Sequence, residues 1–168
     1  MNPPSRASLI FGVLLIAAGA VMLLLTLLPG ASLALTWPVI FYIFAAGFAL
    51  PYFAWPAARR GLAALFIPGA ILLSLGLVFT YNVLTSDWVS WAYAWLLIVT
   101  GVGAGLALAG SLGGWSRPVF WVGVWMAGVS VGLFGLFATL FGAPLLKTIG
   151  ALLVMAAGAL LLLRSFRR

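Results

Sequence analysis

Residues 61–83 read GLAALFIPGAILLSLGLVFTYNV, a continuous apolar run without a charged residue. The run follows Arg59 and Arg60 directly and ends shortly before Asp87, the only acidic residue of the chain. At the α-helical rise of about 1.5 Å per residue, a run of this length crosses a bilayer core of roughly 30 Å. The stretch therefore predicts a membrane-spanning helix with charge at both ends.

Five further apolar runs of similar length surround this one. Together they predict six spans, at about residues 7–28, 38–58, 61–83, 88–112, 118–141 and 144–163. Helices are expected, because a membrane β-barrel would show segments of about ten residues with alternating polarity. We therefore predict an all-α polytopic membrane protein. Residues 1–168 form a single domain of six transmembrane helices, paired as three hairpins.

The charge composition agrees with a membrane location. A soluble domain carries about a quarter charged residues, whereas only 5% of this chain is charged. The net charge of +7 comes from basic residues at the ends of the apolar runs, where they meet lipid headgroups. Nucleic-acid binding would need a basic face in polar surroundings. The sequence thus predicts the lipid bilayer as a partner and excludes nucleic acid.

The distribution of the basic residues predicts the orientation. With a cytoplasmic N-terminus, the inner segments hold Arg6, Arg59, Arg60, Arg117, Arg164, Arg167 and Arg168, and the outer side holds Asp87 and Lys147. An excess of Lys and Arg in short cytoplasmic loops is the usual topology signal. Both termini are therefore predicted to be cytoplasmic. Seven Arg against one Lys, with abundant Ala, Gly and Leu, fit a GC-rich bacterial genome, so we expect the bacterial cytoplasmic (inner) membrane.

A cleaved signal peptide is the alternative for the first span. Arg6, the apolar run and Ser32-Leu33-Ala34 together resemble a cleavage pattern. However, the run over residues 7–28 exceeds the usual signal core of about 7–15 residues. An uncleaved span is the favoured interpretation.

Small residues in the fourth and fifth spans predict close helix contacts. Gly101 and Gly105 form one GxxxG pair, and Gly128 and Gly132 form another. This spacing lets two helix backbones approach closely. The contacts can lie within the chain or join it to a partner, and we expect all four glycines to face helices. We also expect kinks where Pro51 and Pro68 interrupt their spans.

Among the tryptophans, Trp95 and Trp125 do not fit an interfacial belt. Each lies about eight residues into its span, roughly 12 Å from the end. Trp88, Trp91 and Trp95 form a stripe on one face of the fourth span, and Trp121 and Trp125 form one on the fifth. Such a stripe can cradle a lipid, a quinone or a pigment ring, or it can simply pack against a helix or acyl chains. We expect the Trp95 and Trp125 rings to touch protein or a bound ligand rather than bulk lipid.

The chain holds little that could carry out chemistry. It has no His, Cys or Glu, and its ionisable side chains outside the arginines are Asp87, Lys147 and four Tyr. No carboxylate pair, metal-ligand cluster or nucleophile–base set can be assembled from these. We therefore predict no enzymatic activity, no catalytic residue, no metal and no cofactor.

Asp87 and Lys147 are candidates for an ion pair on the outer side. Such a pair would join the second hairpin to the third, and at an exposed site it is worth about 0–1 kcal/mol. The alternative is a solvated Asp87 and a Lys147 whose ammonium extends to the interface.

Two stretches carry a family resemblance: residues 65–76, LFIPGAILLSLG, and residues 88–95, WVSWAYAW. With the Gly-x6-Gly and Trp-Pro patterns, they resemble small uncharacterised bacterial multi-span membrane proteins. These are similar to the transmembrane region of LiaI/LiaF-like envelope-stress proteins. The resemblance implies an envelope-stress or sensory role and no catalytic residues.

Three functional hypotheses follow. The first is a non-catalytic structural or accessory component that acts through helix–helix or lipid contacts, as a subunit of a larger membrane complex or by self-association. The second is the envelope-stress component that the resemblance implies. The third is a carrier or binder of a neutral or lipidic molecule, suggested by Pro51, Pro68 and the Trp stripes.

Overall fold

The computed structural model describes residues 6–27 and 36–165, and within these ranges the chain is helical without a strand. The elements are α1 (Arg6–Leu27), α3 (Val39–Ala54), η1 (Pro56–Ala58), α4 (Arg59–Leu62), η2 (Ala63–Leu65), α5 (Phe66–Thr85), η3 (Trp88–Ser90), α6 (Trp91–Ala94), α7 (Leu96–Leu112), α8 (Arg117–Phe141) and α9 (Pro144–Ser165). The end of the first predicted span, the stretch Ser32-Leu33-Ala34, Arg167 and Arg168 lie outside the described residues.

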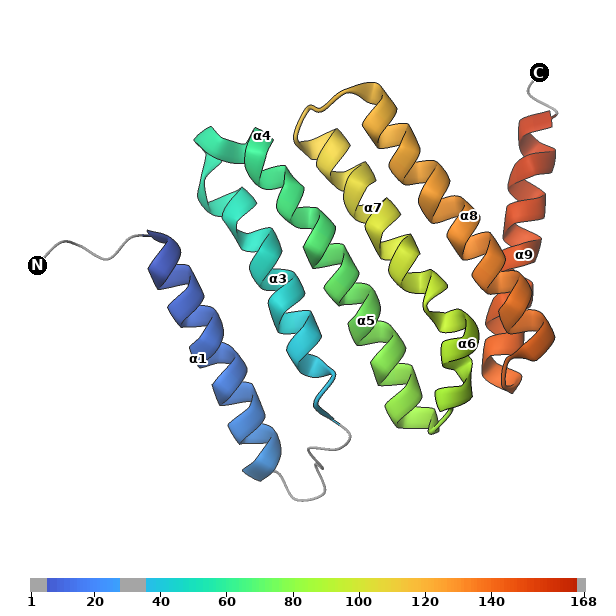
Figure 1. Cartoon of the computed structure of the whole chain (residues 1–168), viewed down its shortest axis with the longest axis horizontal. Coiled ribbons are helices and arrows are strands. Elements are labelled where there is room, and N and C mark those ends of the chain that lie inside the picture. Colours follow the sequence, from blue (N-terminus) through green and yellow to red (C-terminus); the bar gives the residue numbers. More distant parts are fainter. Residues whose placement is uncertain (1–5, 28–35, 166–168) are drawn as a thin grey trace, which may run out of the picture.

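The helices lie side by side in a row that follows chain order (Figure 1). Packing is most extensive between α7 and α8, followed by α5 with α7, α8 with α9, and α3 with α5, whereas α1 contacts α3 only lightly. The predicted grouping into three hairpins stays a prediction, because successive helices of such a row are hairpin partners as well. The largest interface joins the second predicted hairpin to the third, because each inner helix of a row packs against both of its neighbours.

Two of the described helices are long and apolar enough to cross a membrane. The first is Pro56–Thr85, a continuous helical stretch made up of η1, α4, η2 and α5. The second is α8, Arg117–Phe141. Residues 88–94 and 96–112 make a third if the bent pair counts as one span. The other apolar helical stretches, at 15–24, 39–54 and 144–159, are shorter.

The two edges of the row differ in charge. Figure 1 shows the beginnings of α1 and α8, the short α4 and the end of α9 at one edge, and the α5–η3 and α8–α9 connections at the other. The first edge, called here the basic edge, includes the positions of Arg6, Arg59, Arg60, Arg117 and Arg164. The second, called the Asp87 edge, includes Asp87 and Lys147.

Aromatic rings fasten the helices near the Asp87 edge. Phe79 of α5 lies 4.7 Å from the ring centre of Trp37, 5.2 Å from Phe41 of α3 and 5.5 Å from Trp91 of α6. Aromatic pairs at these separations contribute about 0.5–1.5 kcal/mol beyond their buried area. A second cluster joins α6, α7, α8 and α9 through Tyr93, Leu96, Phe134, Ala138 and Leu146.

Candidate functional site

The fourth predicted span breaks at Trp95. The arm formed by η3 and α6 meets α7 at 46°. At the break the Ile98 amide donates to the Trp95 carbonyl at 2.9 Å, an i→i−3 bond typical of 3₁₀ geometry. The indole Nε1 of Trp95 also donates to the Ala92 carbonyl at 3.2 Å. A sharp bend thus arises at a position where the sequence holds no proline.

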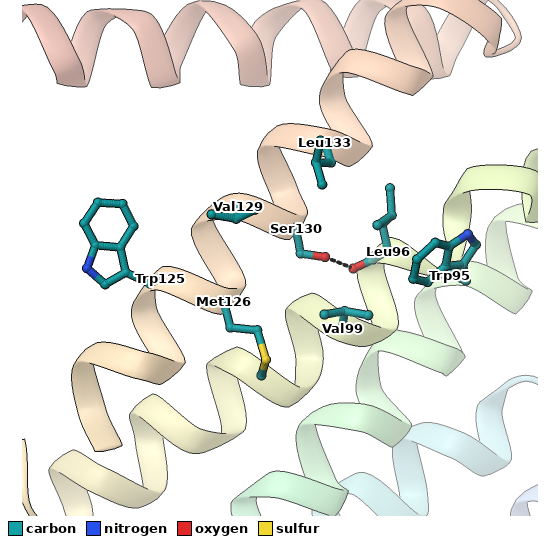
Figure 2. Close-up of a pocket in the computed structure, with 8 residues that line it drawn as sticks. All are labelled: Trp95, Leu96, Val99, Trp125, Met126, Val129, Ser130 and Leu133. Carbon is teal, nitrogen blue, oxygen red and sulfur yellow. Dashed lines mark hydrogen bonds between the residues drawn. The ribbon is translucent and has the colours of Figure 1, made fainter. Parts of the chain in front are cut away.

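A groove of about 390 Å³ lies beside this bend, between the start of α7 and the middle of α8 (Figure 2). Its lining consists of Trp95, Leu96, Val99, Trp125, Met126, Val129, Ser130 and Leu133. Figure 2 shows Trp95 and Trp125 at opposite margins and the other side chains between them. The volume falls in the range of about 300–1,000 Å³ that is usual for small-molecule sites.

The polar side chain of the lining, Ser130, is already engaged. Its hydroxyl donates to the Leu96 carbonyl of α7 at 2.5 Å, and the residue is 3% exposed. The same carbonyl accepts a bond from Thr100 Oγ1 at 3.0 Å. The groove surface is accordingly apolar throughout, and it offers an occupant no hydrogen-bonding group.

Helix α8 packs closely against α7 and against α6 beside the groove. Toward the basic edge, a Cβ added to Gly103 of α7 would lie 2.5 Å from the Ala127 amide nitrogen of α8. Toward the Asp87 edge, the Tyr93 ring centre lies 6.0 Å from that of Phe134. The groove is therefore a shallow depression on the surface of these helices, open on its outer side.

Trp95 and Trp125, the two tryptophans selected from the sequence, both line this groove, and much of each side chain is exposed. Trp95 is 48% exposed and Trp125 is 63% exposed. Each ring contributes one wall, and much of each remains free to meet whatever surrounds the helices.

Gly101 and Gly105 of α7 face α5. A Cβ on Gly105 would lie 2.6 Å from the Ile67 Cα, and one on Gly101 would lie 2.7 Å from the Ala70 carbonyl oxygen. These distances leave no room for a side chain, so the two backbones meet directly.

Gly128 and Gly132 of α8 lie differently, because a Cβ at either would meet no atom within 4 Å. As a contact inside the chain, the prediction for this pair is wrong. The small residues of α8 that do face α7 are Gly123 and Ala127, and they lie on another side of the helix. Contact of Gly128 and Gly132 with a partner stays a prediction.

The fourth and fifth spans were expected to form the most important contact surface, and α7 and α8 do share the most extensive interface, but the residues at which their backbones cross were not predicted. Gly103 lies against Ala127, and Gly123 lies against Ala107, with a Cβ on Gly123 only 2.5 Å from the Ala107 amide nitrogen. The signal was present, because 103 and 107, like 123 and 127, are small residues four apart.

Asp87 has a partner other than the one predicted. Its Oδ2 accepts a bond from the Tyr81 hydroxyl at 3.0 Å, and its amide donates to Thr85 Oγ1 at 3.3 Å. Lys147 is exposed in the first turn of α9, and within the described ranges no ion pair joins it to Asp87. The reason is local: the turn after α5 folds the carboxylate back onto its own helix.

Asn82 and Ser90 form a buried polar pair that sequence reasoning did not single out, although an Asn inside an apolar span is a visible signal. They are 0% and 1% exposed. Ser90 Oγ lies 2.7 Å from both Asn82 Oδ1 and the Asp87 carbonyl, whereas Asn82 Nδ2 has no partner. A hydroxyl has one proton and cannot donate to both acceptors. With the amide turned over, Nδ2 donates to Ser90 and Ser90 donates to Asp87, so we assign that orientation.

Among the residues that the structure describes, no group of three or more His, Cys, Asp or Glu could hold a metal ion. No protein-family model matches the chain, and neither a curated protein nor a solved structure matches it. The resemblance to the LiaI/LiaF-like transmembrane region therefore stays a prediction.

Proposed function

We propose that the chain is a non-catalytic, multi-pass integral membrane protein, a structural or accessory component that acts through contacts of its helices with lipid and with other membrane proteins. The observation that carries this proposal is the single row of helices. In a single row of helices, both broad faces of the layer stay exposed. Apolar side chains such as Leu77 (56% exposed), Val129 (56%) and Met155 (69%) remain uncovered on its helices. Water would penalise such faces, whereas lipid tails are as apolar as the side chains themselves.

The described polar side chains support a role without catalysis. Ser130 and Thr100 both donate to the Leu96 carbonyl, and Thr139 donates to its own helix at the Gly135 carbonyl at 2.7 Å. Asp87 is bonded to Tyr81. Each of these groups is thus engaged in holding backbone or a turn.

We further propose six spans with both termini on the cytoplasmic side of a bacterial inner membrane. Support comes from the separation of charge between the two edges of the row, since the positions of five arginines fall at the basic edge. Helices shorter than a bilayer core can still span it by local thinning and by contact with neighbours. The six segments would then cross in alternating directions.

Single-cysteine labelling tests this topology directly, because the chain has no cysteine of its own. Ser86→Cys at the Asp87 edge and Ser116→Cys at the basic edge are matched conservative changes at exposed sites. In intact spheroplasts, a membrane-impermeant maleimide is expected to label Ser86→Cys only. Ser116→Cys should react after permeabilisation. Labelling of both from one side, or the reverse pattern, contradicts the topology.

The accessory role is tested by the size of the native complex. After solubilisation in a mild detergent, blue-native electrophoresis of the full chain from its own membrane should show a species larger than the monomer. Migration as a free monomer under the mildest conditions that extract it argues against action through protein partners and leaves lipid contacts as the remaining mode.

A further inference from the structure

We propose that the groove between Trp95 and Trp125 binds one acyl chain of a membrane lipid as a resident ligand. The inference rests on the proposed membrane location and goes beyond it, because it assigns a defined site. Bulk lipid touches every exposed helix face, whereas this groove would hold its chain between two helices.

The chemistry of the lining selects a hydrocarbon. The Ser130 hydroxyl is bonded to the Leu96 carbonyl and the Trp95 indole N–H to the Ala92 carbonyl, and the surface that lines the groove is apolar. A polar occupant would lose its hydrogen bonds to water without gaining any, at a cost of about 1–3 kcal/mol for each group. A methylene chain loses nothing there, and it gains dispersion contacts with Val99, Met126 and Val129.

The shape of the groove selects a thin chain rather than a helix. A helix with side chains is about 10–12 Å across. The α7 and α8 backbones meet at Gly103 beside Ala127, and α6 packs against α8 at Tyr93 beside Phe134, so an element of that width cannot enter between the two helices. A single acyl chain is thin enough to lie in the surface groove that Trp95 and Trp125 border.

The depth of the groove fits a chain from the leaflet at the Asp87 edge. Its α8 wall runs from Trp125 to Leu133, which corresponds to about 12 Å of helix. Trp95 lies seven residues after Trp88, the start of its arm at that edge, about 10 Å at the α-helical rise. One leaflet contributes roughly 15 Å of the hydrocarbon core, so the tail of a lipid anchored at the Asp87 edge reaches the groove.

Photolabelling tests the site. The full chain is reconstituted in vesicles of phosphatidylcholine and phosphatidylglycerol that contain a trace of phosphatidylcholine with a diazirine in the middle of one acyl chain. After illumination, lipid adducts are mapped by mass spectrometry. Met126 and Leu133 in the groove should carry several-fold more adduct than Leu152 and Met155, which are exposed on α9.

Two matched variants separate the groove from the open face of α8. Val122 and Val129 are 58% and 56% exposed and lie two helical turns apart, but only Val129 lines the groove. Val129→Trp should fill the groove and lower labelling at Met126 and Leu133 several-fold, whereas Val122→Trp should leave it unchanged. Val129→Phe provides a smaller filling residue if the Trp variant does not fold.

Three outcomes overturn the proposal. Even labelling of groove and exposed α9 residues, unaffected by Val129→Trp, means bulk lipid only. A disulfide-linked dimer of Val129→Cys places a second copy on the groove instead. Absence of adducts on α9 as well means that the chain does not insert, which defeats the proposed membrane function itself, so the two failures are distinguishable.

Discussion

Gly101 with Gly105 and Gly128 with Gly132 have the same spacing in apolar helices, yet the structure treats them in opposite ways. The first pair meets the α5 backbone, with the Ile67 Cα only 2.6 Å from where a Cβ on Gly105 would be. The second pair faces open space. A GxxxG pair thus permits close approach, but it does not say that a neighbour is there.

The difference follows from the position of each helix in the row. Helix α7 has a neighbour on both sides, and its buried glycines serve both: Gly101 and Gly105 face α5, and Gly103 faces α8. Helix α8 turns Gly123 and Ala127 toward α7. The GxxxG pair of α8, Gly128 and Gly132, therefore contacts no other helix among the described residues. It lies near the exposed Trp125 on the same helix.

The largest expected effect separates the two pairs by a single substitution. Gly105→Leu would push a side chain into the Ile67 backbone, which cannot move aside without parting α5 from α7. We expect a loss of about 3 kcal/mol or more, at or beyond the upper end of overpacking. Gly132→Leu should leave stability unchanged or raise it by up to about 1 kcal/mol, the difference in helix propensity. Thermal unfolding followed by fluorescence-detected size exclusion measures the stability of both variants. An equal loss of stability in the two would contradict the difference between the two glycine pairs.

A smaller probe tests the α7–α8 crossing. Gly103→Ala adds one methyl group 2.5 Å from the Ala127 amide nitrogen, a backbone atom that yields only if the helices separate. The expected cost is about 1–3 kcal/mol. Gly158→Ala is the control, because a Cβ there meets no atom within 4 Å. If Gly103→Ala unfolds at the same temperature as the control, the two backbones do not touch in the membrane.

The hydrogen bond across this interface is expected to contribute less. Ser130→Ala removes the bond to the Leu96 carbonyl, and bonds between membrane helices average about 0.6 kcal/mol with a maximum near 1.7. Ser111→Ala is the matched control, since Ser111 is exposed and donates to its own helix at the Leu108 carbonyl. Unfolding of the two variants in mixed micelles compares them, and a greater loss for Ser111→Ala would refute the role given to Ser130.

Much of the local structure could be predicted from the sequence. The charge-free runs and their boundaries at Arg59, Asp87 and Arg117 indicate helices. Both ends of α8 and the C-terminal end of α5 lie within two residues of the predicted ones. This works because the length of an apolar run and the absence of charge are local properties. The described helices that meet the length and composition expected of a span are nevertheless two, or three with the bent pair.

The arrangement could not be predicted, because it depends on which face of each helix finds a neighbour. In spans that are apolar all round, hydrophobic periodicity gives no direction. Proline suggested kinks at Pro51 and Pro68, whereas the described 46° bend lies at Trp95, where 3₁₀ geometry and the indole bond combine. The groove lies beside that bend, so the two tryptophans could be chosen from the sequence, whereas the groove that they border could not be predicted.

The smallest expected effect has the opposite sign and is the sharpest test of the Gly128 and Gly132 pair. Gly128→Ala adds a methyl group where nothing lies within 4 Å, and Ala is preferred to Gly inside a helix by roughly 0.5–1 kcal/mol. In the isolated chain this variant should therefore be neutral or slightly stabilised, whereas Gly103→Ala is destabilised. The unfolding temperature of the purified monomer measures the first effect. Blue-native electrophoresis of membrane extracts then shows whether a partner uses this face, because a methyl group at a close helix contact would weaken the larger complex without harming the monomer. A destabilised monomer would mean that Gly128 already has a neighbour within the chain, and the contrast between the two glycine pairs would fall.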